Sequence, residues 1–176
     1  MSMHMIFEKI IRLLGVFICL LSTGCVVNYF QLEHEPTKRL LKGVSISDIE
    51  MSEELPFENV LFVPFFNKLT ISYPVPESYL RVYSLEKRDV KVQSAVLING
   101  SKKNILELNK IVTLKKSDKG YFSGGIKLFD SDKFDVSKLS KGDFVKLKVL
   151  LNIDGIDNEL VFLLKLVEYS DIAWST

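Results

Sequence analysis

The amino-acid sequence predicts an all-β fold, an antiparallel β-sandwich of about seven or eight strands preceded by an N-terminal signal helix and a tether. Two observations lead to this prediction. From Phe57 onward, short apolar and β-branched runs recur between turn residues, at the spacing that sandwiches and barrels show. Several of these runs alternate apolar with polar residues, which is the period of a strand with one buried face.

The first strands of the sandwich are expected between residues 58 and 85. Glu58–Phe66 is a near-continuous apolar run and predicts a buried strand. Leu69–Tyr73 and Tyr79–Leu85 follow as two more strands. Between them lies Pro74-Val75-Pro76, which predicts a loop because proline cannot donate a hydrogen bond to a strand ladder.

A hairpin is expected around Asn99-Gly100, the preferred pair for a two-residue type I′ turn, in which both central residues need a positive φ. The flanking segments alternate as strands, with Lys110 as the one interruption. The residues expected to share a face are Val90, Val92, Ser94, Val96 and Ile98 before the turn, and Leu106, Leu108, Val112 and Leu114 after it.

Two more segments complete the expected sandwich. Gly120–Phe129 predicts a strand in which Gly124-Gly125 marks a bulge or a bend. A second hairpin turns at Asp154–Asn158. Its apolar positions are Val145, Leu147, Val149, Leu151 and Ile153 before the turn, and Leu160, Phe162, Leu164 and Leu166 after it. The shape that we expect is immunoglobulin-like or transthyretin-like.

Residues 25–55 mix apolar and charged side chains without a sustained period, and we expect a tether with short structured pieces. Pro36 near the start and Gly43 just past the end of a short segment predict one or two helical turns between them. Val26–Leu32 is an alternative first strand. His34, in this segment, is expected to be a solvated tether residue rather than a ligand or a base.

The N-terminus has the features of a signal peptide. Lys9 and Arg12 precede an apolar run from Leu13 to Leu21, which is too short to span a bilayer, since a spanning helix needs about 20 apolar residues. The run continues into Ser22-Thr23-Gly24-Cys25. An uncleaved anchor helix from about Ile10 to Val27 is the alternative, and the charge of Arg12 and the polar Ser22-Thr23 weaken it.

The segment Leu21-Ser22-Thr23-Gly24-Cys25 resembles the lipobox of bacterial lipoproteins. The resemblance implies cleavage between Gly24 and Cys25 and lipidation of the Cys25 thiol, with Ser22 standing where Leu is usual. It divides the chain into a signal peptide (1–24), a lipidated tether (25–55) and a sandwich domain (56–176). The residue after Cys25 is Val26 rather than Asp. By resemblance to the sorting pattern of enterobacterial lipoproteins, this favours the outer membrane, with the protein facing the periplasm.

Composition narrows the possible functions. After removal of residues 1–24, the remaining 152 residues are formally neutral, so no nucleic-acid partner and no polybasic membrane patch is expected. Cys25 is then the one remaining cysteine, which leaves no intramolecular disulfide. The domain has no His or Cys set for zinc or nucleophilic chemistry, so we expect no cofactor, no metal and no enzymatic activity. The acidic loops with Asp130, Asp132 and Asp135, and with Asp154, Asp157 and Glu159, do not follow the calcium-loop pattern and are expected to be solvated.

Aromatic side chains offer candidate binding surfaces. Those from Phe62 to Tyr83 are expected mostly to pack in the core or on sheet faces. The loop with Tyr73, Pro74 and Pro76 is a possible partner surface, and so is Trp174, which otherwise covers a sheet edge. An exposed edge strand is a third docking possibility.

Leu80-Arg81-Val82-Tyr83-Ser84-Leu85 resembles a strand of the outer-membrane lipoprotein of type VI secretion systems, a lipidated β-sandwich that docks an inner-membrane partner. The first hypothesis for function is a membrane-anchored, non-enzymatic lipoprotein that binds another envelope protein or serves in assembly. The alternatives are a sugar- or lipid-binding module, a secretion-system accessory lipoprotein, and a carboxylate-based hydrolase.

Overall fold

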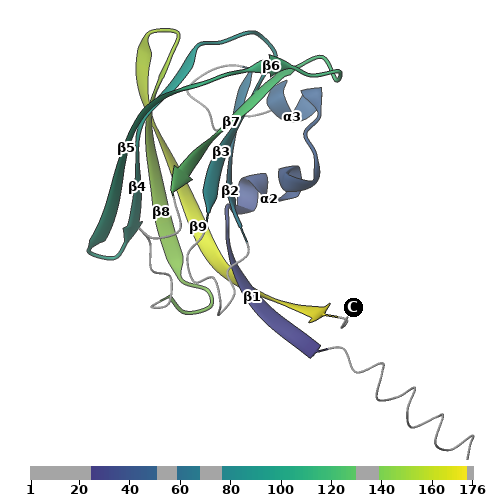
Figure 1. The fold of residues 1–176 in the computed structure, drawn as a ribbon, viewed down its shortest axis with the longest axis vertical. Helices are drawn as coiled ribbons and strands as arrows, with labels where there is room; N and C mark the ends of the chain where they lie inside the picture. The colour runs from purple at the N-terminus through teal and green to yellow at the C-terminus, as the bar shows by residue number, and fades with distance from the viewer. Residues whose placement is uncertain (1–24, 51–58, 68–76, 130–138, 174–176) are drawn as a thin grey trace, which may run out of the picture. The chain divides into compact units, whose positions relative to one another are not determined.

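The computed structural model describes residues 25–50, 59–67, 77–129 and 139–173, and it confirms the predicted antiparallel β-sandwich. Two sheets face each other (Figure 1). The five-stranded sheet has the order β1 (Cys25–Glu33), β9 (Ile156–Ala173), β8 (Phe144–Ile153), β4 (Val90–Asn99) and β5 (Lys102–Val112). The four-stranded sheet has the order β2 (Val60–Phe66), β3 (Ser78–Ser84), β7 (Phe122–Phe129) and β6 (Lys115–Lys116).

The chain divides into two compact units. Among the described residues, 25–29 and 169–173 form one unit, in which the Tyr29 and Tyr169 rings stack with centroids 5.4 Å apart. In the same unit the Ser170 hydroxyl donates a hydrogen bond to Asn28 Oδ1 over 2.8 Å. The second unit runs from Phe30 to Glu168 and contains the two facing sheets.

The core of the larger unit lies between the two sheets. Strand β8 shows its construction most clearly, because its odd-numbered side chains are buried and its even-numbered ones point away from the core. Across the β8–β9 ladder the buried side chains of β9 continue the same layer. The predicted inward faces of this hairpin are confirmed, and they consist of Val145, Leu147, Val149, Leu151 and Ile153 on β8, and Leu160, Phe162, Leu164 and Leu166 on β9.

Strand β4 changes face within its length, so the predicted shared face is wrong in its second half. Gln93 is an extra residue relative to β8, where Val92 pairs with Leu151 and Ser94 already pairs with Leu150. Such a bulge shifts the alternation by one residue. The side chains buried beyond it are those of Ala95 and Leu97, whereas Val96 and Ile98 lie on the outer face. On β5, Leu106, Leu108 and Val112 contact the core as predicted, and so does Leu114 just after the strand.

The two hairpin turns also differ from expectation. Asn99 pairs with Lys102, so the first turn has Gly100 and Ser101 at its centre, and of the two only Gly100 has a positive φ, of 56°. Glycine at the first central position is typical of a type II′ turn. In the second hairpin, Asp154 (φ 50°) and Gly155 (φ 90°) are both central and both positive, which is the type I′ pattern.

Gly124 and Gly125 lie in regular register with Val82 and Arg81, so of the predicted bulge or bend the bulge is wrong. The β3–β7 irregularity lies instead between Ser78 and Tyr79. Gly124 is required for another reason: a Cβ atom there would lie 2.6 Å from the Thr113 carbonyl oxygen.

A short helical layer covers part of the outer face of the four-stranded sheet (Figure 1). It consists of α2 (Glu35–Lys38), the 3-10 helix η1 (Arg39–Lys42) and α3 (Ile46–Glu50), which includes the helical turns predicted between Pro36 and Gly43. This layer forms a second apolar cluster against β2, and β2 is therefore buried on both faces, as its continuous apolar run requires. The buried members are Leu40, Val44, Ile49, Leu61, Val63 and Tyr121.

Val26–Leu32 forms a strand, which was the alternative to a tether, and it lies within β1. His34 is only 9 % exposed, so the expectation of a solvated residue is wrong. Its Nδ1 atom lies 2.9 Å from the Thr37 hydroxyl, and its ring packs edge-on against Phe162. None of the helices in the described ranges has the length and apolar character needed to cross a bilayer.

We predict that Gly124→Ala lowers the free energy of unfolding by about 1–3 kcal/mol, because the new methyl group would overlap the Thr113 carbonyl. Gly125→Ala is the matched control. Its Cβ atom would meet nothing closer than 3.5 Å, so we expect a change within about 0.5 kcal/mol. Urea denaturation of the two variants measures the difference, and equal stabilities would contradict the close approach.

Candidate functional site

An open groove with a volume of about 430 Å³ lies on the outer face of the four-stranded sheet. Strand β3 supplies its wall, because Leu80 and Val82 point into the core and the residues between them must point outward. Strands β2 and β7 add the neighbouring side chains. The lining residues are Phe65, Tyr79, Arg81, Tyr83, Ser123, Gly124 and Gly125.

The hollow depends on Gly125, which lies directly across the ladder from Arg81. Any larger side chain on β7 at this outward position would fill the space beside the guanidinium. The next outward position toward Tyr83 holds Ser123, whose side chain is also small. The small residues of β7 therefore leave open space beside the side chains of β3.

Arg81 is the cation of the groove. Its guanidinium carbon lies 4.8 Å from the centre of the Phe65 ring, a cation–π contact that holds one face of the guanidinium against the sheet. Within the described ranges no carboxylate pairs with this side chain. A planar guanidinium with free donors matches the two oxygens of a carboxylate or phosphate.

Tyr79 stands at one end of the groove. Its ring lies 6.4 Å from that of Phe65, and its hydroxyl donates to Glu77 Oε2 over 3.3 Å. Glu77 is itself held by Lys127, whose ammonium group lies 2.7 Å from Oε1. Because Lys127 neutralises Glu77, this carboxylate does not compete for Arg81.

Tyr83 stands at the other end of the groove. Its ring meets that of Tyr121 edge to face, with centroids 5.8 Å apart. Tyr121 is buried in the second apolar cluster, so the helical layer fixes the position of Tyr83. The groove thus presents three half-buried rings and one cation, which are contacts for stacking, apolar burial and recognition of an anion.

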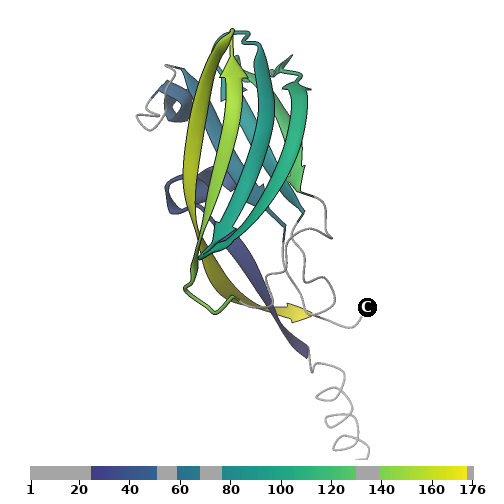
Figure 2. The same cartoon turned by 90° about the vertical axis from the view of Figure 1, so that its left-hand side faces the viewer.

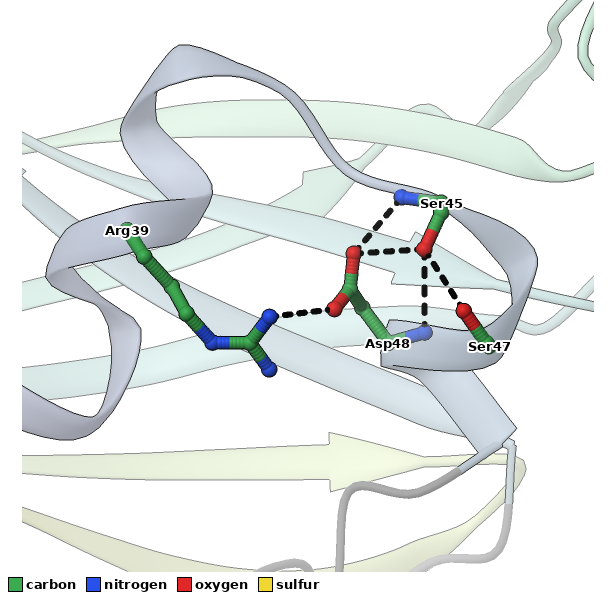
Figure 3. Close-up of polar contacts among 4 residues, drawn as sticks. All are labelled: Arg39, Ser45, Ser47 and Asp48. Carbon is green, nitrogen blue, oxygen red and sulfur yellow. Dashed lines mark hydrogen bonds and ion pairs between the residues drawn. The ribbon is translucent and has the colours of Figure 1, made fainter.

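A polar cluster of Arg39, Ser45, Ser47 and Asp48 lies beside α3 (Figure 3). The Ser45 hydroxyl, 2.7 Å from Asp48 Oδ2, superficially suggests an activated nucleophile. The Asp48 N–H, however, donates to Ser45 Oγ over 3.3 Å, and the Ser45 N–H donates to Asp48 Oδ2 over 2.9 Å. These reciprocal bonds are those of a helix capping box, and Arg39 adds an ion pair at 2.9 Å.

The pKa of Asp48 is lowered by this arrangement. The largest cause is the hydrogen bond from the Ser45 hydroxyl, followed by the Ser45 backbone N–H, and the charge of Arg39 adds to both. Burial acts in the opposite direction but does not offset them. The carboxylate is therefore held charged to close the turn before α3.

The acidic residues of the second hairpin accept hydrogen bonds from other residues of the protein. Asp154 accepts hydrogen bonds from Arg88 and from the Asp89 N–H, each over 2.9 Å, and the Asp89 bond is the main cause that lowers the pKa of Asp154. Asp157 and Glu159 accept hydrogen bonds from Gln93 and Lys148. Among the described residues no group of three metal-ligating side chains gathers. Asp130, Asp132 and Asp135 lie outside the described ranges.

The residues singled out from the sequence do not form this groove. Tyr73, Pro74, Pro76, Trp174 and Gly24 lie outside the described ranges, and of Cys25 only the backbone, at the start of β1, is described. Phe65, Tyr79 and Tyr83 were expected to pack in the core or on a sheet face. Each is half-buried and lines the groove on the four-stranded sheet. The signal for the groove is the alternation of Tyr79, Arg81 and Tyr83 with buried apolar residues.

We predict that Asp48→Asn lowers the free energy of unfolding at pH 7 by about 1 kcal/mol, the usual value of a helix cap. The folded-state pKa lies below the model-peptide value of 3.8, so the carboxylate stabilises the fold above that pH and ceases to do so as the pH falls through the folded pKa. The gap between wild type and variant should therefore narrow as the pH falls below about 5 and close once the pH is below the folded-state pKa. Denaturation curves across this range test it, with Asp118→Asn on an exposed turn as control; a gap that stays constant with pH would contradict it.

Comparison with known proteins leaves the groove and the capping box to be interpreted from their own geometry. No family model, no curated protein and no solved structure matches this chain.

Proposed function

We propose that this chain is a bacterial envelope lipoprotein. Acyl chains on Cys25 hold it to the outer membrane, where it faces the periplasm. It serves as a non-enzymatic binding or assembly factor, and it engages another envelope protein through the groove of β3. The observation that carries the binding role is Arg81, held against Phe65 between two tyrosines without a carboxylate partner among the described residues.

The anchor is supported by the lipobox-like segment that ends at Cys25. Strand β1 begins at Cys25, so cleavage before this residue removes no part of any described element. Two or three acyl chains hold a protein where a single chain binds only marginally.

The chemistry of the groove favours a segment of protein as its occupant. Small-molecule sites usually enclose most of the ligand surface, whereas this groove is open along a sheet face. Tyrosine and arginine are the side chains enriched at the energetic centres of protein interfaces. An extended segment with an apolar side chain beside a carboxylate would use both the rings and the guanidinium.

A sugar-binding module is the second candidate, and the spacing of Tyr79 and Tyr83 favours it. The two residues are four positions apart on one strand face, so their Cα atoms are separated by about 13 Å, a span that suits more than one sugar ring. A secretion-system accessory role is compatible with the first candidate, because the segment that resembles such lipoproteins, Leu80–Leu85, overlaps β3.

The anchor predicts that Cys25→Ala abolishes labelling by radioactive palmitate and leaves a precursor that retains residues 1–24. The reason is that the thiol is the group that accepts the lipid before cleavage. Cys19→Ala is the matched control and should label and mature normally. Undiminished labelling of the Cys25→Ala protein would exclude this anchor.

The groove predicts that a photo-crosslinking phenylalanine analogue at Tyr79 forms an adduct with one envelope protein in intact cells, and that Arg81→Gln reduces its yield about tenfold or more, since loss of a charged hydrogen bond costs about 1.5–3 kcal/mol. Arg81→Lys, which keeps the charge but not the planar fork, should restore it only in part. The same analogue at Lys119, on an exposed turn, is the control. Adducts that do not depend on Arg81, or adducts with polysaccharide alone, would contradict a protein partner.

A further inference from the structure

The outer face of the five-stranded sheet carries a second candidate binding surface, which contains several exposed apolar side chains. Strands of a sandwich normally present polar side chains outward, yet Ile105, Val161 and Leu163 are 62 %, 50 % and 53 % exposed. We call this surface the basic apolar face and define it by Ile105, Phe144, Val161 and Leu163 together with Lys103 and Lys146. Figure 2 looks onto this sheet, and none of the described helices or strands lies over it.

The bulge at Gln93 helps to build the face. Because it shifts the alternation of β4, Val96 and Ile98 leave the core and lie outward, where Val96 pairs with Ile105 and Ile98 pairs with Lys103. These two half-buried side chains lie between the exposed residues of β5 and those of β8 and β9. The apolar side chains of β5 and β4 are thus followed on β8 by Lys146 and Lys148, and on β9 by Val161 and Leu163.

Charge is sorted along this sheet. Lys103 and Lys146 flank Ile98 in one row and are exposed, and neither has a carboxylate partner among the described residues. The carboxylates of Glu107 and Glu159 lie in another row, where both flank the central pair of Ser94 and Leu150. Lys148 marks the boundary, because it forms an ion pair with Glu159 over 2.8 Å.

We propose that the basic apolar face rests on the surface of a bilayer that contains anionic phospholipid. Exposed isoleucine, valine, leucine and phenylalanine side chains enter the boundary between headgroups and acyl chains, while lysines extend their ammonium groups to the phosphates. The proposal rests on the proposed function for one point, that acyl chains on Cys25 keep the protein at the membrane.

The face differs from a polybasic membrane patch, which the neutral charge of the mature chain argues against. Two unpaired lysines are too few to recruit a protein from solution. An acylated protein needs no recruitment, so weak attraction decides only which side of the domain meets the lipid.

The test uses the acylated full-length protein reconstituted in vesicles. Cys25 carries the lipid and Cys19 leaves with the leader, so an engineered cysteine is the one thiol that takes a fluorophore. We place it at Val161→Cys on the face and, as control, at Lys119→Cys on an exposed turn. Nitroxide-bearing lipids in phosphatidylcholine vesicles, with or without phosphatidylglycerol, then quench fluorophores that approach the bilayer.

We expect quenching at Val161→Cys to be several-fold stronger than at Lys119→Cys when phosphatidylglycerol is present. Replacing both lysines, Lys103→Gln with Lys146→Gln, should reduce it to the level seen with phosphatidylcholine alone, whereas Lys116→Gln with Lys119→Gln, on and beside β6 of the other sheet, should not. Equal quenching at the two positions, or quenching indifferent to the lysines, would overturn the proposal. Self-quenching between labels at Val161→Cys in both lipids would assign the face to a second copy and overturn it as well.

The experiment tests the proposed lipid anchor and the proposed membrane-facing surface by separate readouts. Flotation with pure phosphatidylcholine vesicles depends on the acyl chains alone, and its absence would refute the anchor. The difference that phosphatidylglycerol makes to quenching depends on the face alone.

Discussion

Burial of the odd-numbered side chains of β8 is the constraint on which the larger unit depends. Val145, Leu147, Val149, Leu151 and Ile153 are all 0 % exposed, and a shift of one residue in either ladder would replace them with Lys146 and Lys148. The neighbours β4 and β9 must therefore bring apolar side chains to the same layer. Strand β4 brings Val90 and Val92 to this layer before its bulge at Gln93, and Ala95 and Leu97 beyond it.

Both outer faces of the sandwich follow from this layer. On the four-stranded sheet, the helical layer covers the β2 side, and the β3 side remains open as the groove around Arg81. On the five-stranded sheet, exposed apolar side chains lie outward beside lysines. The same packing thus leaves two outer surfaces, the groove and the basic apolar face, for which we propose a protein segment and a lipid surface as occupants.

The groove was not predicted as a site, although its residues were visible. Tyr79, Arg81 and Tyr83 alternate with buried residues of β3, so their outward direction follows from the strand period. That Phe65 lies beside Arg81, and that Gly125 leaves the space opposite it, depends on how β2 and β7 pair with β3. Strand order is a long-range property, and neither neighbour lies within a dozen residues of Arg81 along the chain.

The sequence by itself determined the sandwich class, the inward faces of β8 and β9, the buried character of β2 and the short helix after Pro36, because each follows from periods and turn residues within a few positions. Only the tertiary structure decided the face of Val96 and Ile98, the turn centred on Gly100 and Ser101, the need for glycine at Gly124 and the burial of His34. These features arise where one segment meets another that is distant in sequence. A bulge, a close backbone approach or a buried histidine is set by that partner, and the local pattern does not contain it.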